Sequence, residues 1–528
     1  MSNHAYESAA ALRPGSNGPI PISTLCERFS LAPASADDAA ALNDLSILGV
    51  SVDSGDTAPG ELFVGLPGFT AHGARFSAEA VGSGAVAVLT DADGALIAHE
   101  VVPGTPVLVH DDPRAVVGSL SAEVYHHPAR GLVTTAVTGT NGKTTTSYFL
   151  DAILSAHVGG CMVAGTVELR VGERSVESPR TTVEAPVLQR MMALAVEDRV
   201  GAASLEASSH AIVLHRLDGV VVDVAGFTNL QRDHLDFHKT MEGYLEAKAR
   251  LFTPEHARRG VICVDDQWGA ALAAQAPIEV DRVRAYPGDA PADWWVSDAA
   301  VSLTDSATTF TLHGPDGEQI EASCPLPGLV NVQNAALALV MAIRAGVPAA
   351  TATAALAGAH NIPGRMQRIS QRDGRRGLCI VDFAHTPEAM DLALKAVRPI
   401  TPGRLIVVFG SDGDRDQGKR PMLGEVCARL ADVLVVTDEN PRSEDPQLIR
   451  NAILDGIRTV RPGLEDVEEV TTWRGDAVRR GVELCGPDDT VIVTGKGHEP
   501  FLEMAGEFIR YNDAPVMAEA VEEKWGRG

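Results

Sequence analysis

The sequence predicts an α/β protein of three domains, the last of them a Rossmann-like, doubly wound parallel sheet. Three observations support this fold class. The chain has 528 residues, enough for about three domains of ordinary size. A β-prone run at 132–137 leads through a glycine turn into a helical stretch that ends near residue 154. In the last third of the chain, apolar strand patterns alternate with helical patterns, as in parallel sheets with helices on both faces.

The beginning of the chain is polar and contains glycine, proline and serine, without a basic segment followed by an apolar run. We therefore expect residues 1–21 to form a disordered tail and not a signal peptide. No window of about 18 apolar residues occurs, so we expect no membrane span. Seven cysteines are scattered without a C-x-x-C motif, which favours reduced thiols and a cytoplasmic protein.

The chain is acidic, with a net charge of −26 at pH 7, and 45% of its residues are hydrophobic. The charge argues against non-specific binding to nucleic acid, because the phosphates would be repelled. Any anionic ligand must then be held by local devices, such as helix N-termini, bound Mg²⁺ and a few arginines and lysines. We expect a monomer without a nucleic-acid partner.

Residues 22–127 contain short apolar runs separated by turns, at 47–52, 61–66, 85–89 and 107–109. This pattern predicts a small α/β domain. Inside it, the sequence Asp53-Ser54-Gly55-Asp56 is typical of a β-turn when taken alone. His126-His127-Pro128 is expected to form the linker to the next domain.

The central domain, expected at residues 128–362, begins with V-T-T-A-V-T-G-T-N-G-K-T-T-T. A strand, a glycine loop and a helix N-terminus make a cradle for phosphate, because backbone N–H groups and the helix dipole both attract anions. Lys143 is placed to reach the outer phosphates, and Thr144 to bind Mg²⁺. The loop is shorter than the usual G-x-x-x-x-G-K-[ST], which would need glycine where this chain has Val137.

Three further places in the central domain carry groups suited to a metal. An apolar strand ends in Glu206, where an enzyme with a phosphate loop needs a Mg²⁺ ligand. The next strand, at 219–227, leads to residues 233–238, which include two histidines and two aspartates. By itself this cluster fits a transition metal as well as Mg²⁺. Lys248 lies on the next predicted helix, at 241–251, where spacing alone favours a solvent-exposed side chain.

The third domain, expected at residues 363–528, has strand patterns at 378–383, 404–410, 433–437 and 490–494. Unusual polar residues directly follow these strands, at 384–386, 412–415, 439–442 and 496–499. Ligands of open α/β sheets bind at the carboxyl ends of the strands, so these four clusters predict one binding site. Arg415 and Arg442 suit carboxylates, whereas Glu499 suits an ammonium group.

The loop G-T-N-G-K-T-T resembles the ATP loop of the Mur ligases and of folylpolyglutamate synthetase. Other segments resemble the MurE type of Mur ligase, and the resemblance extends over residues 51–514. These segments are Y-L-E-A-K-A-R-L-F, V-D-F-A-H-T-P, G-S-D-G-D-R-D-Q-G-K-R-P, T-D-E-N-P-R-S-E-D-P and T-G-K-G-H-E. The chain departs from the family pattern at Gly55 (Arg in the family), Val183 (Pro), Asp412 (Gly) and Glu439 (Asp).

The resemblance implies a central P-loop ATPase-like domain and an ATP-dependent ligase of peptidoglycan synthesis, and so a role in cell-wall growth, cell shape and division. The implied substrates are UDP-N-acetylmuramoyl-L-alanyl-D-glutamate and meso-2,6-diaminopimelate, joined through an acyl phosphate. The implied catalytic residues are Lys143, Glu206, His234 and Lys248. The implied Mg²⁺ ligands are Thr144, Glu206, His234 and Lys248, the last carrying a carbamate derived from CO₂.

The resemblance also implies three groups of binding residues. Contacts with ATP are expected from Gly139, Thr140, Asn141, Gly142, Lys143, Thr144, Thr145, Asn331, Asn334, Arg365, Asp382 and His385. Contacts with the UDP-linked substrate are expected from Ser54, Phe69, Thr70, Ala71, Thr181, Thr182, Ser208 and Arg216. Contacts with the amino acid are expected from Arg415, Glu439, Asn440, Pro441, Arg442, Gly495 and Glu499. Asn331 and Asn334 equally fit a pair of residues that caps a helix N-terminus.

Three alternatives stay open. Lysine would leave a buried Arg442 without a carboxylate, which favours diaminopimelate, but lysine, ornithine and diaminobutyrate remain alternative substrates. A ligase like folylpolyglutamate synthetase would share the phosphate loop but not the N-terminal block or the N-P-R motif. A regulatory nucleotide-binding module without catalysis would not need Glu206, His234 and Lys248 in addition to the loop.

Overall fold

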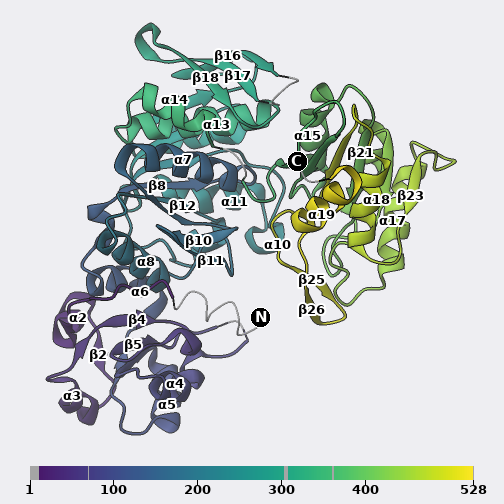
Figure 1. Cartoon of the computed structure of the whole chain (residues 1–528). Coiled ribbons are helices and arrows are strands. Elements are labelled where there is room, and N and C mark those ends of the chain that lie inside the picture. Colours follow the sequence, from purple (N-terminus) through teal and green to yellow (C-terminus); the bar gives the residue numbers. More distant parts are fainter. Residues whose placement is uncertain (1–10, 69, 303–306, 360–361, 527–528) are drawn as a thin grey trace. The chain divides into compact units, whose positions relative to one another are not determined.

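The structure is a computed structural model that describes residues 11–68, 70–302, 307–359 and 362–526. The chain divides into two compact units (Figure 1). The first comprises Met1–Trp295 and Ala336–Ala355, and the second comprises Val296–Ala335 and Leu356–Gly528. The first unit thus contains the expected N-terminal domain and most of the expected central domain, and the second contains the expected C-terminal domain.

The N-terminal domain is an α/β sheet, as predicted, with the strand order β2-β7-β6-β5-β4. Strands β4 (Gly49–Ser51), β5 (Glu61–Val64), β6 (Ala87–Thr90) and β7 (Val107–Val109) run parallel, and β2 (Ala32–Pro33) is antiparallel to β7. Its helices are α2 (Ile22–Phe29), α3 (Ala36–Leu42), α4 (Ser77–Gly82), α5 (Ala92–Val101) and α6 (Pro113–Val124). Leu62, Leu89 and Leu120 meet in its core, where strand and helix side chains are removed from water.

The segment before α2 differs from the expected disordered tail. From residue 11 onward it is folded, and β1 (Ile20–Pro21) pairs with β3 (Ser46–Ile47). Leu12 is fully buried in the core of the central domain, and Arg13 forms ion pairs with Asp56 and Glu61. One buried apolar side chain and one paired cation hold a segment whose composition is otherwise polar. The first ten residues of the expected tail lie outside the described residues.

The central domain is organised around β8 (Val133–Thr138), and the strand order in the first unit is β11-β10-β9-β12-β8-β13-β14-β15. Strands β12 (Ala202–Glu206) and β13 (Val222–Phe227) flank β8 and run parallel to it. Glu206 lies opposite Val137, so the carboxyl ends of β8 and β12 meet where the glycine loop begins. This edge is where parallel sheets bind ligands.

The other elements of the central domain lie between these three strands or after them in the sequence. The strands are β9 (Cys161–Ala164), β10 (Glu168–Val171), β11 (Arg174–Glu177), β14 (Ala257–Cys263) and β15 (Val280–Arg284). The helices are α7 (Lys143–Val158), α8 (Ala185–Glu197), α9 (Ser209–Val213), α10 (Leu235–His238), α11 (Met241–Ala249) and α12 (Gln267–Gln275). Helix α7 packs against β9 and β12, which holds the helix N-terminus at the end of β8.

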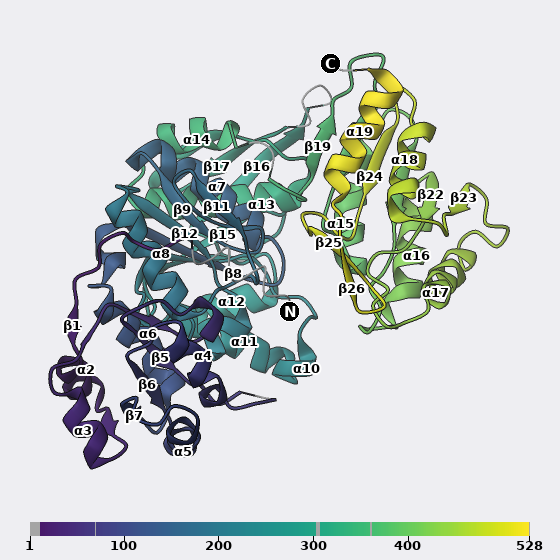
Figure 2. The same ribbon diagram turned by 60° about the horizontal axis from the view of Figure 1, so that its bottom comes forward.

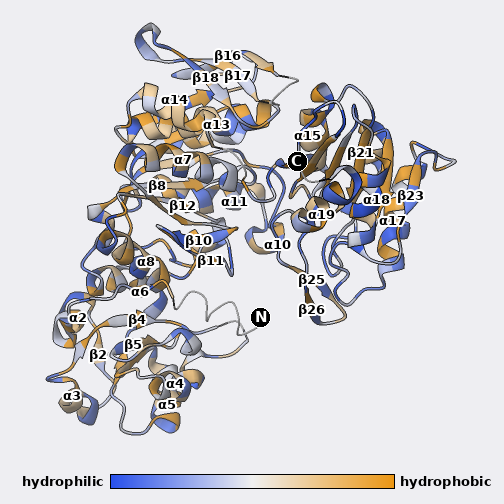
Figure 3. Cartoon of the chain, in the orientation of Figure 1, coloured by the Kyte–Doolittle hydropathy of each residue, from blue (hydrophilic) through white to orange (hydrophobic). Residues whose placement is uncertain are grey.

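The second unit contains the predicted doubly wound sheet, with the strand order β19-β20-β24-β21-β22-β23. Strands β20 (Leu378–Val381), β24 (Thr490–Val493), β21 (Leu405–Phe409), β22 (Val433–Val436) and β23 (Val467–Glu469) run parallel, and the edge strand β19 (Gln367–Ser370) is antiparallel. Every residue of β20, β21, β22 and β24 is buried, so both faces are covered. Figure 3 shows β21 mainly in hydrophobic colours.

The helices that belong to this α/β sheet are α15 (Pro387–Val397), α16 (Lys419–Leu430), α17 (Pro446–Arg458), α18 (Arg474–Leu484) and α19 (Asp513–Trp525) (Figure 2). The unit also holds the part of β16 (Trp294–Val301) that begins at Val296, together with β17 (Thr308–His313) and β18 (Gln319–Cys324). It further holds a hairpin made of β25 (Phe501–Met504) and β26 (Glu507–Arg510). Helix α13 (Leu329–Arg344) begins in the second unit and ends in the first, followed by α14 (Ala349–Ala357). Among the described helices, none has the length and apolarity that a bilayer crossing would need.

Candidate functional site

The phosphate loop connects β8 to α7 through two glycines in left-handed conformations. Gly139 has a φ of +147° and Gly142 a φ of +89°, which residues with a Cβ rarely adopt. A Cβ atom at Gly139 would lie 1.8 Å from Oγ1 of Thr228, so glycine is required there. Lys143 begins α7, and its Nζ donates hydrogen bonds to the carbonyl oxygens of Gly139 and Thr140, both at 2.9 Å. The predicted strand, loop and helix are confirmed.

The segment after β13 braces this loop. The backbone N–H of Asn141 donates to Oδ1 of Asn229 at 3.1 Å, and Asn141 Nδ2 donates to Oε1 of Gln231 at 2.8 Å. The backbone N–H of Gln231 donates to Oγ1 of Thr140 at 2.9 Å. Thr145 is buried in the first turn of α7. Sequence reasoning missed Asn229 and Gln231, whose only signal was their place directly after the predicted strand at 219–227.

Two oxygen donors that the sequence places at a Mg²⁺ site lie in contact. Oγ1 of Thr144 donates a hydrogen bond to Oε2 of Glu206 at 3.1 Å, and Glu206 is only 1% exposed. Thr166, which follows β9, donates to the same carboxylate through its hydroxyl at 2.8 Å and its backbone N–H at 2.9 Å. Sequence reasoning missed Thr166, because its approach depends on β9 lying beside β12.

Lys248 is buried, so the interpretation of this residue as a solvent-exposed lysine is wrong. Its Nζ donates to the carbonyl oxygen of Gly139 at 2.8 Å and lies 4.5 Å from the centre of the Tyr244 ring. Burial penalises the ammonium form, and the nearby charge of Lys143 adds repulsion, so the pKa of Lys248 lies well below its ordinary range. The side chain therefore carries a neutral amine more readily than an ordinary lysine does.

Three histidines gather beside Lys248 on the segment from α9 to α11. The ring centre of His210 lies 4.9 Å from that of His234 and 5.5 Å from that of His238. His238 stacks on Tyr244 at 4.9 Å, and its Nε2 lies 2.8 Å from Oγ of Ser209. Partial burial and the repulsion from His210 lower the pKa of His238 to about 4, so this imidazole is neutral at pH 7. Only His234 of these histidines is among the predicted site residues.

Among the described residues, no group of three or more His, Cys, Asp or Glu side chains is arranged to hold a metal ion. A transition-metal site at residues 233–238 therefore has no support. Mg²⁺ prefers oxygen ligands, and Thr144 and Glu206 supply these next to the phosphate loop. His234 is 46% exposed and supplies one nitrogen, whereas a plain amine at Lys248 supplies no oxygen. These residues fit a second Mg²⁺ only when Lys248 carries a carbamate.

The residues predicted for the peptide side of the UDP-linked substrate lie together around Glu206. Oγ1 of Thr182 donates to the backbone carbonyl of Glu206 at 2.7 Å and accepts from the backbone N–H of Ser208 at 3.0 Å. Arg216 Nη1 donates to the carbonyl of Thr182 at 3.3 Å. Oγ1 of Thr181 lies 3.2 Å from Oγ1 of Thr166, which links this group to the Glu206 carboxylate.

The residues predicted for the uridine side are less tightly connected. Ser54 is buried and its Oγ donates to Oε2 of Glu79 at 2.8 Å, which sequence reasoning missed. The predicted turn at residues 53–56 forms a single 3₁₀ turn (Ser54–Asp56), in which the backbone N–H of Asp56 donates to the carbonyl of Asp53 at 3.1 Å. Thr70 and Ala71 are exposed, and Phe69 lies outside the described residues.

A buried ionic cluster that no sequence pattern indicated lies in the same unit. Arg190 of α8 is fully buried, and its two terminal nitrogens contact the carboxylate of Asp56 at 2.8 and 3.1 Å. Arg13 adds a second cation to Asp56. The pair therefore links the N-terminal domain to α8 of the central domain, within the first unit.

In the second unit, the two asparagines predicted for ATP lie in the first turns of α13. Nδ2 of Asn331 donates to the carbonyl of Pro327, which precedes the helix, at 2.7 Å. Asn334 is 2% exposed, and its Oδ1 has no hydrogen-bond partner within the described part of the chain. A buried amide oxygen of this kind can accept a hydrogen bond from a donor group of a ligand.

The segments before and after β20 position the remaining ATP candidates. Asp382 accepts from the backbone N–H groups of Met366 at 2.8 Å and Ala384 at 2.9 Å, and burial raises the pKa of its carboxyl group. The guanidinium of Arg365 lies 4.3 Å from the centre of the Phe383 ring. Nδ1 of His385 lies 3.0 Å from the carbonyl oxygen of Phe383. All three predicted residues therefore lie around one short stretch of chain.

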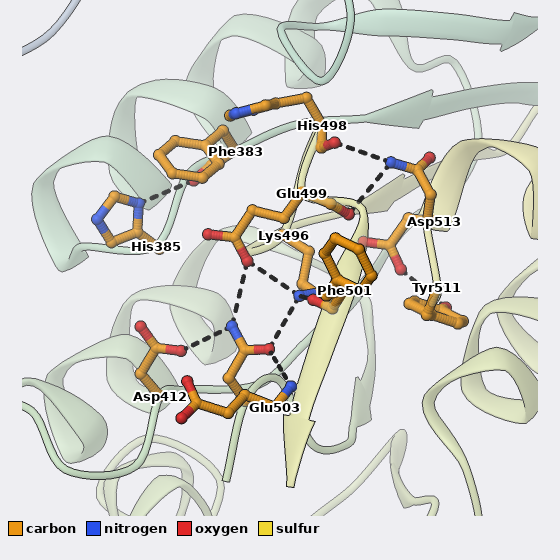
Figure 4. A network of polar contacts seen from close by, with 12 residues as sticks. Phe383, His385, Asp412, Lys496, His498, Glu499, Phe501, Glu503, Tyr511 and Asp513 are labelled. Carbon is orange, nitrogen blue, oxygen red and sulfur yellow. Dashed lines mark hydrogen bonds and ion pairs between the residues drawn. The ribbon is translucent and has the colours of Figure 1, made fainter. Parts of the chain in front are cut away.

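At the carboxyl ends of β24 and β22, a polar network surrounds Lys496 (Figure 4). The fully buried Nζ of Lys496 donates to Oδ1 of Asn440 and Oε2 of Glu499, both at 2.9 Å, and to the carbonyl of Phe501 at 2.6 Å. Nδ2 of Asn440 donates to Oε2 of Glu499 and Oδ1 of Asp412, both at 3.1 Å. The structure thus brings together three of the four polar clusters predicted for one site.

Arg442 already has anionic neighbours, which corrects the expectation that it would stay unpaired without a distal carboxylate. Its Nε lies 3.2 Å from Oε2 of Glu503, and its Nη2 lies 3.7 Å from Oδ2 of Asp412. Its backbone has a φ of +53° and donates to the carbonyl of Glu503 at 3.1 Å. Arg415 is exposed, and no contact with this network is seen within the described ranges, so its contact with the amino acid stays a prediction.

Glu439 lies fully buried at the end of β22. Burial, together with the charge of Asp412, raises the pKa of Glu439 to about 8. Gly495, with a φ of +108°, is packed so closely that a Cβ there would lie 2.4 Å from Oε2 of Glu439. Pro441 is packed equally closely, since a Cβ at Gly413 would lie 1.9 Å from its carbonyl oxygen.

Known proteins resemble this chain along nearly its whole length. Family models match at residues 46–125 (Mur ligase family, catalytic domain), 137–342 (Mur ligase middle domain) and 364–497 (Mur ligase, glutamate ligase domain). A UDP-N-acetylmuramoyl-L-alanyl-D-glutamate–2,6-diaminopimelate ligase of Streptomyces coelicolor is 41% identical over 515 residues, which cover 97% of this chain and 99% of that protein. A UDP-N-acetylmuramyl-tripeptide synthetase of Leifsonia xyli is 42% identical over 508 residues, with coverages of 95% and 96%.

A solved structure of a UDP-N-acetylmuramoyl-L-alanyl-D-glutamate–2,6-diaminopimelate ligase has the same fold. It matches with a TM-score of 0.64 and 30% identity, covering 91% of this chain and 95% of that chain. The order of the matched domains, the phosphate loop and the extent of the sequence identity agree, and the chain belongs to the Mur ligase family.

Proposed function

We propose that this chain is an ATP-dependent ligase that adds meso-2,6-diaminopimelate to UDP-N-acetylmuramoyl-L-alanyl-D-glutamate in peptidoglycan synthesis. The observation that carries the proposal is the phosphate loop with Lys143 folded over it and Thr144 bonded to the buried Glu206. The name of the Streptomyces coelicolor relative, which covers 97% of this chain, supports the choice of substrates. The seven cysteines are free thiols, which supports a cytoplasmic enzyme, and we propose that it acts as a monomer.

The proposed reaction has two steps. A carboxylate oxygen of the D-glutamyl residue attacks the γ-phosphorus of ATP, and the bond from phosphorus to the β-γ bridging oxygen breaks to give an acyl phosphate and ADP. The amino group of the incoming amino acid then attacks the acyl carbon. A C–N bond forms, the C–O bond to phosphate breaks and the amine loses a proton. Such chemistry needs mainly positioned anions and neutralised charge.

Two features of the chain would neutralise the phosphates. Nζ of Lys143 lies over the loop, and the N-terminus of α7, which begins at Lys143, adds the positive end of a helix dipole. Thr144 and Glu206 would hold one Mg²⁺, and His234 with a carboxylated Lys248 would hold a second. When bound, Mg²⁺ shields the phosphate oxygens and so makes the phosphorus easier to attack.

The environment of Lys248 supports its carboxylation. A carbamate forms when a neutral amine attacks CO₂ and releases a proton, and the lowered pKa of Lys248 favours the neutral amine. The modification would replace a buried cation by an anion with two oxygen donors. It would also place that anion beside Lys143 and His234. In the unmodified protein, burial and the charge of Lys143 disfavour the ammonium form of Lys248. Burial and nearby cations, among them Lys248, lower the pKa of His234.

We assign the remaining polar groups to the three substrates. The unpartnered Oδ1 of Asn334 suits the amino group of adenine, with Asn331, Arg365, Asp382 and His385 as further ATP contacts. The group around Thr182, Ser208 and Arg216 suits the peptide end of the UDP-linked substrate. The network of Asn440, Arg442 and Glu499 suits a diamino acid, because it offers both a cation and carboxylates.

Phosphate release from ATP tests the proposal. We expect release only when both UDP-N-acetylmuramoyl-L-alanyl-D-glutamate and meso-diaminopimelate are present. Lys143→Ala should lower the rate by roughly 10² to 10⁴ with the circular dichroism spectrum unchanged. The matched control is Lys239→Ala, which removes an exposed lysine and should leave the rate within about twofold.

Two results would count against this function. Release with a folate and glutamate but not with the muramoyl substrate would favour the folylpolyglutamate synthetase alternative. ATP binding without release under any combination of substrates would favour a regulatory module.

A further inference from the structure

We propose that Asp412 weakens the selectivity of this enzyme for an amino acid with a distal carboxylate, because it supplies Arg442 with a carboxylate of the chain's own. This inference rests on the proposed function, and it deepens it by naming the residue that sets the preference among diamino acids.

The contacts of Arg442 are the first observation. Its guanidinium lies between two carboxylates, at 3.2 Å from Glu503 and 3.7 Å from Asp412. Arg442 is 19% exposed, Asp412 16% and Glu503 31%, so these charges are screened only in part by water. The two contacts are ion pairs by distance, and Nε of Arg442 has no hydrogen-bond partner among the described residues. A substrate carboxylate that approaches Arg442 therefore meets a cation whose charge is partly compensated. It gains less than it would from an isolated arginine.

The fixed position of Asp412 is the second observation. Its Oδ1 accepts a hydrogen bond from Nδ2 of Asn440 at 3.1 Å, and its carbonyl accepts from Nη2 of Arg420 at 3.1 Å. The next backbone N–H, of Gly413, donates to the carbonyl of Asn440 at 2.8 Å. Two of these hydrogen bonds, both with Asn440, hold this short segment against the segment that carries Arg442, and the third fixes it to α16. The Asp412 carboxylate is therefore built into the loop and is not a freely turning side chain.

The charge balance of the network is the third observation. The carboxylates of Asp412 and Glu503 lie beside Arg442, and the carboxylate of Glu499 pairs with Lys496. Glu439 has a pKa of about 8 and adds little negative charge at pH 7. Because both cations already face carboxylates of the chain, the network offers only a small net attraction to a distal carboxylate. An arginine left unpaired by lysine would discriminate by roughly 10² to 10³. We expect the wild-type preference for meso-diaminopimelate over L-lysine to be smaller than that.

The test is a pair of variants that each remove one negative charge from the same loop. Asp412→Asn keeps an oxygen for the bond from Asn440 but removes the charge beside Arg442. Asp416→Asn is the matched control, since Asp416 is exposed and accepts a hydrogen bond from Gly418 within its own turn. The measured quantity is the ratio of kcat/KM for meso-diaminopimelate to kcat/KM for L-lysine and for L-ornithine.

We expect Asp412→Asn to raise this ratio about three- to tenfold, mainly through a lower KM for meso-diaminopimelate, as the loss of one partly exposed ion pair allows. Asp416→Asn should leave the ratio within twofold. Glu503→Gln removes the other anionic neighbour of Arg442 and should raise the ratio as well. A ratio within twofold of wild type for both Asp412→Asn and Asp412→Gly would overturn the proposal.

Direct binding by calorimetry separates this inference from the proposed function. If the wild-type enzyme forms no product with any amino acid, the proposed reaction is wrong. The relative affinities for meso-diaminopimelate and L-lysine then still decide the role of Asp412. The same three- to tenfold shift in the ratio of Kd values supports it, and an unchanged ratio refutes it.

Discussion

At the scale of single residues, two lysines share one acceptor. Nζ of Lys143 and Nζ of Lys248 both donate to the carbonyl oxygen of Gly139, at 2.9 and 2.8 Å. Two ammonium groups so close repel each other, and the buried one loses its charge more easily, as the lowered pKa of Lys248 indicates. The loop therefore places a cation that can bind phosphate next to an amine that can be carboxylated.

The first prediction concerns the modification of Lys248. We expect Lys248→Ala to be nearly inactive and to recover part of its activity with added short-chain carboxylates, which replace the lost oxygen donors. Mass spectrometry of the wild-type protein under CO₂ should show one added carboxyl group on the peptide containing Lys248. If high-resolution data show only a free amine, the second Mg²⁺ needs another oxygen donor.

The second prediction uses the pKa of Glu439. This carboxyl group is ordinary in the unfolded chain but has a pKa of about 8 in the folded protein. The folded state therefore binds the proton more tightly, and the stability it contributes is fully present below about pH 4.5 and is lost as the pH rises towards 8. Glu439→Gln removes this loss, because its amide stays neutral.

Thermal unfolding at two pH values checks that the stability falls as the pH rises. We expect Glu439→Gln to melt about 2 °C or more above wild type at pH 8.5 and at the same temperature as wild type near pH 5. Glu425→Gln, which changes a half-exposed carboxylate of α16, serves as the control and should show no such difference. A melting temperature that is lower than wild type at pH 8.5 would contradict the argument.

At the scale of elements, the junction of β8 and α7 depends on one backbone conformation. Gly139 combines a φ of +147° with a neighbour, Oγ1 of Thr228, at 1.8 Å from a built Cβ. We expect Gly139→Ala to lower ligase activity more than 100-fold, as loss of loop geometry would. Gly288→Ala is the matched control, since a Cβ there has no neighbour within 4 Å in the described structure. Equal activities of the two variants would show that the loop tolerates a shift.

A second element-scale feature is the loop that presents Arg442. The positive φ of Arg442 is unusual for a residue with a Cβ, and backbone hydrogen bonds to Glu503 and from Ala505 hold it against the β25–β26 hairpin. The hairpin itself was not predicted from the sequence. Its role in aiming the guanidinium follows from contacts between segments about 60 residues apart.

At the scale of the whole molecule, the first unit joins two predicted domains through a buried ion pair. Arg190 and Asp56 are 0% and 4% exposed and 134 residues apart in the chain. Arg190→Met leaves the carboxylate of Asp56 with Arg13 alone, so we expect a loss of about 3 kcal/mol, visible as a melting temperature lower by several degrees. Arg258→Met, which removes an exposed ion pair with Asp223, should cost less than about 1 kcal/mol. Similar losses in both variants would mean that burial of the pair has no consequence.

Most elements of the fold were predictable from the sequence. The strands around the phosphate loop and in the last sheet, and the helices α7, α8 and α15–α18, agree with local patterns of apolar residues. The folding of residues 11–21, the hairpin β25–β26 and the inclusion of β17 and β18 in the second unit did not follow from such patterns. Each depends on partners far away in the chain.

The sequence by itself determined the fold class and the phosphate loop, because these depend on a strand, a turn and a helix that are neighbours in the chain. The tertiary structure alone decided the electrostatic state of the site. It buried Lys248 against Gly139, 109 residues away, placed Thr166 on Glu206, and gave Arg442 two carboxylates from other segments. Charge interactions act through space, so spacing along the chain carries no information about which cation is already neutralised.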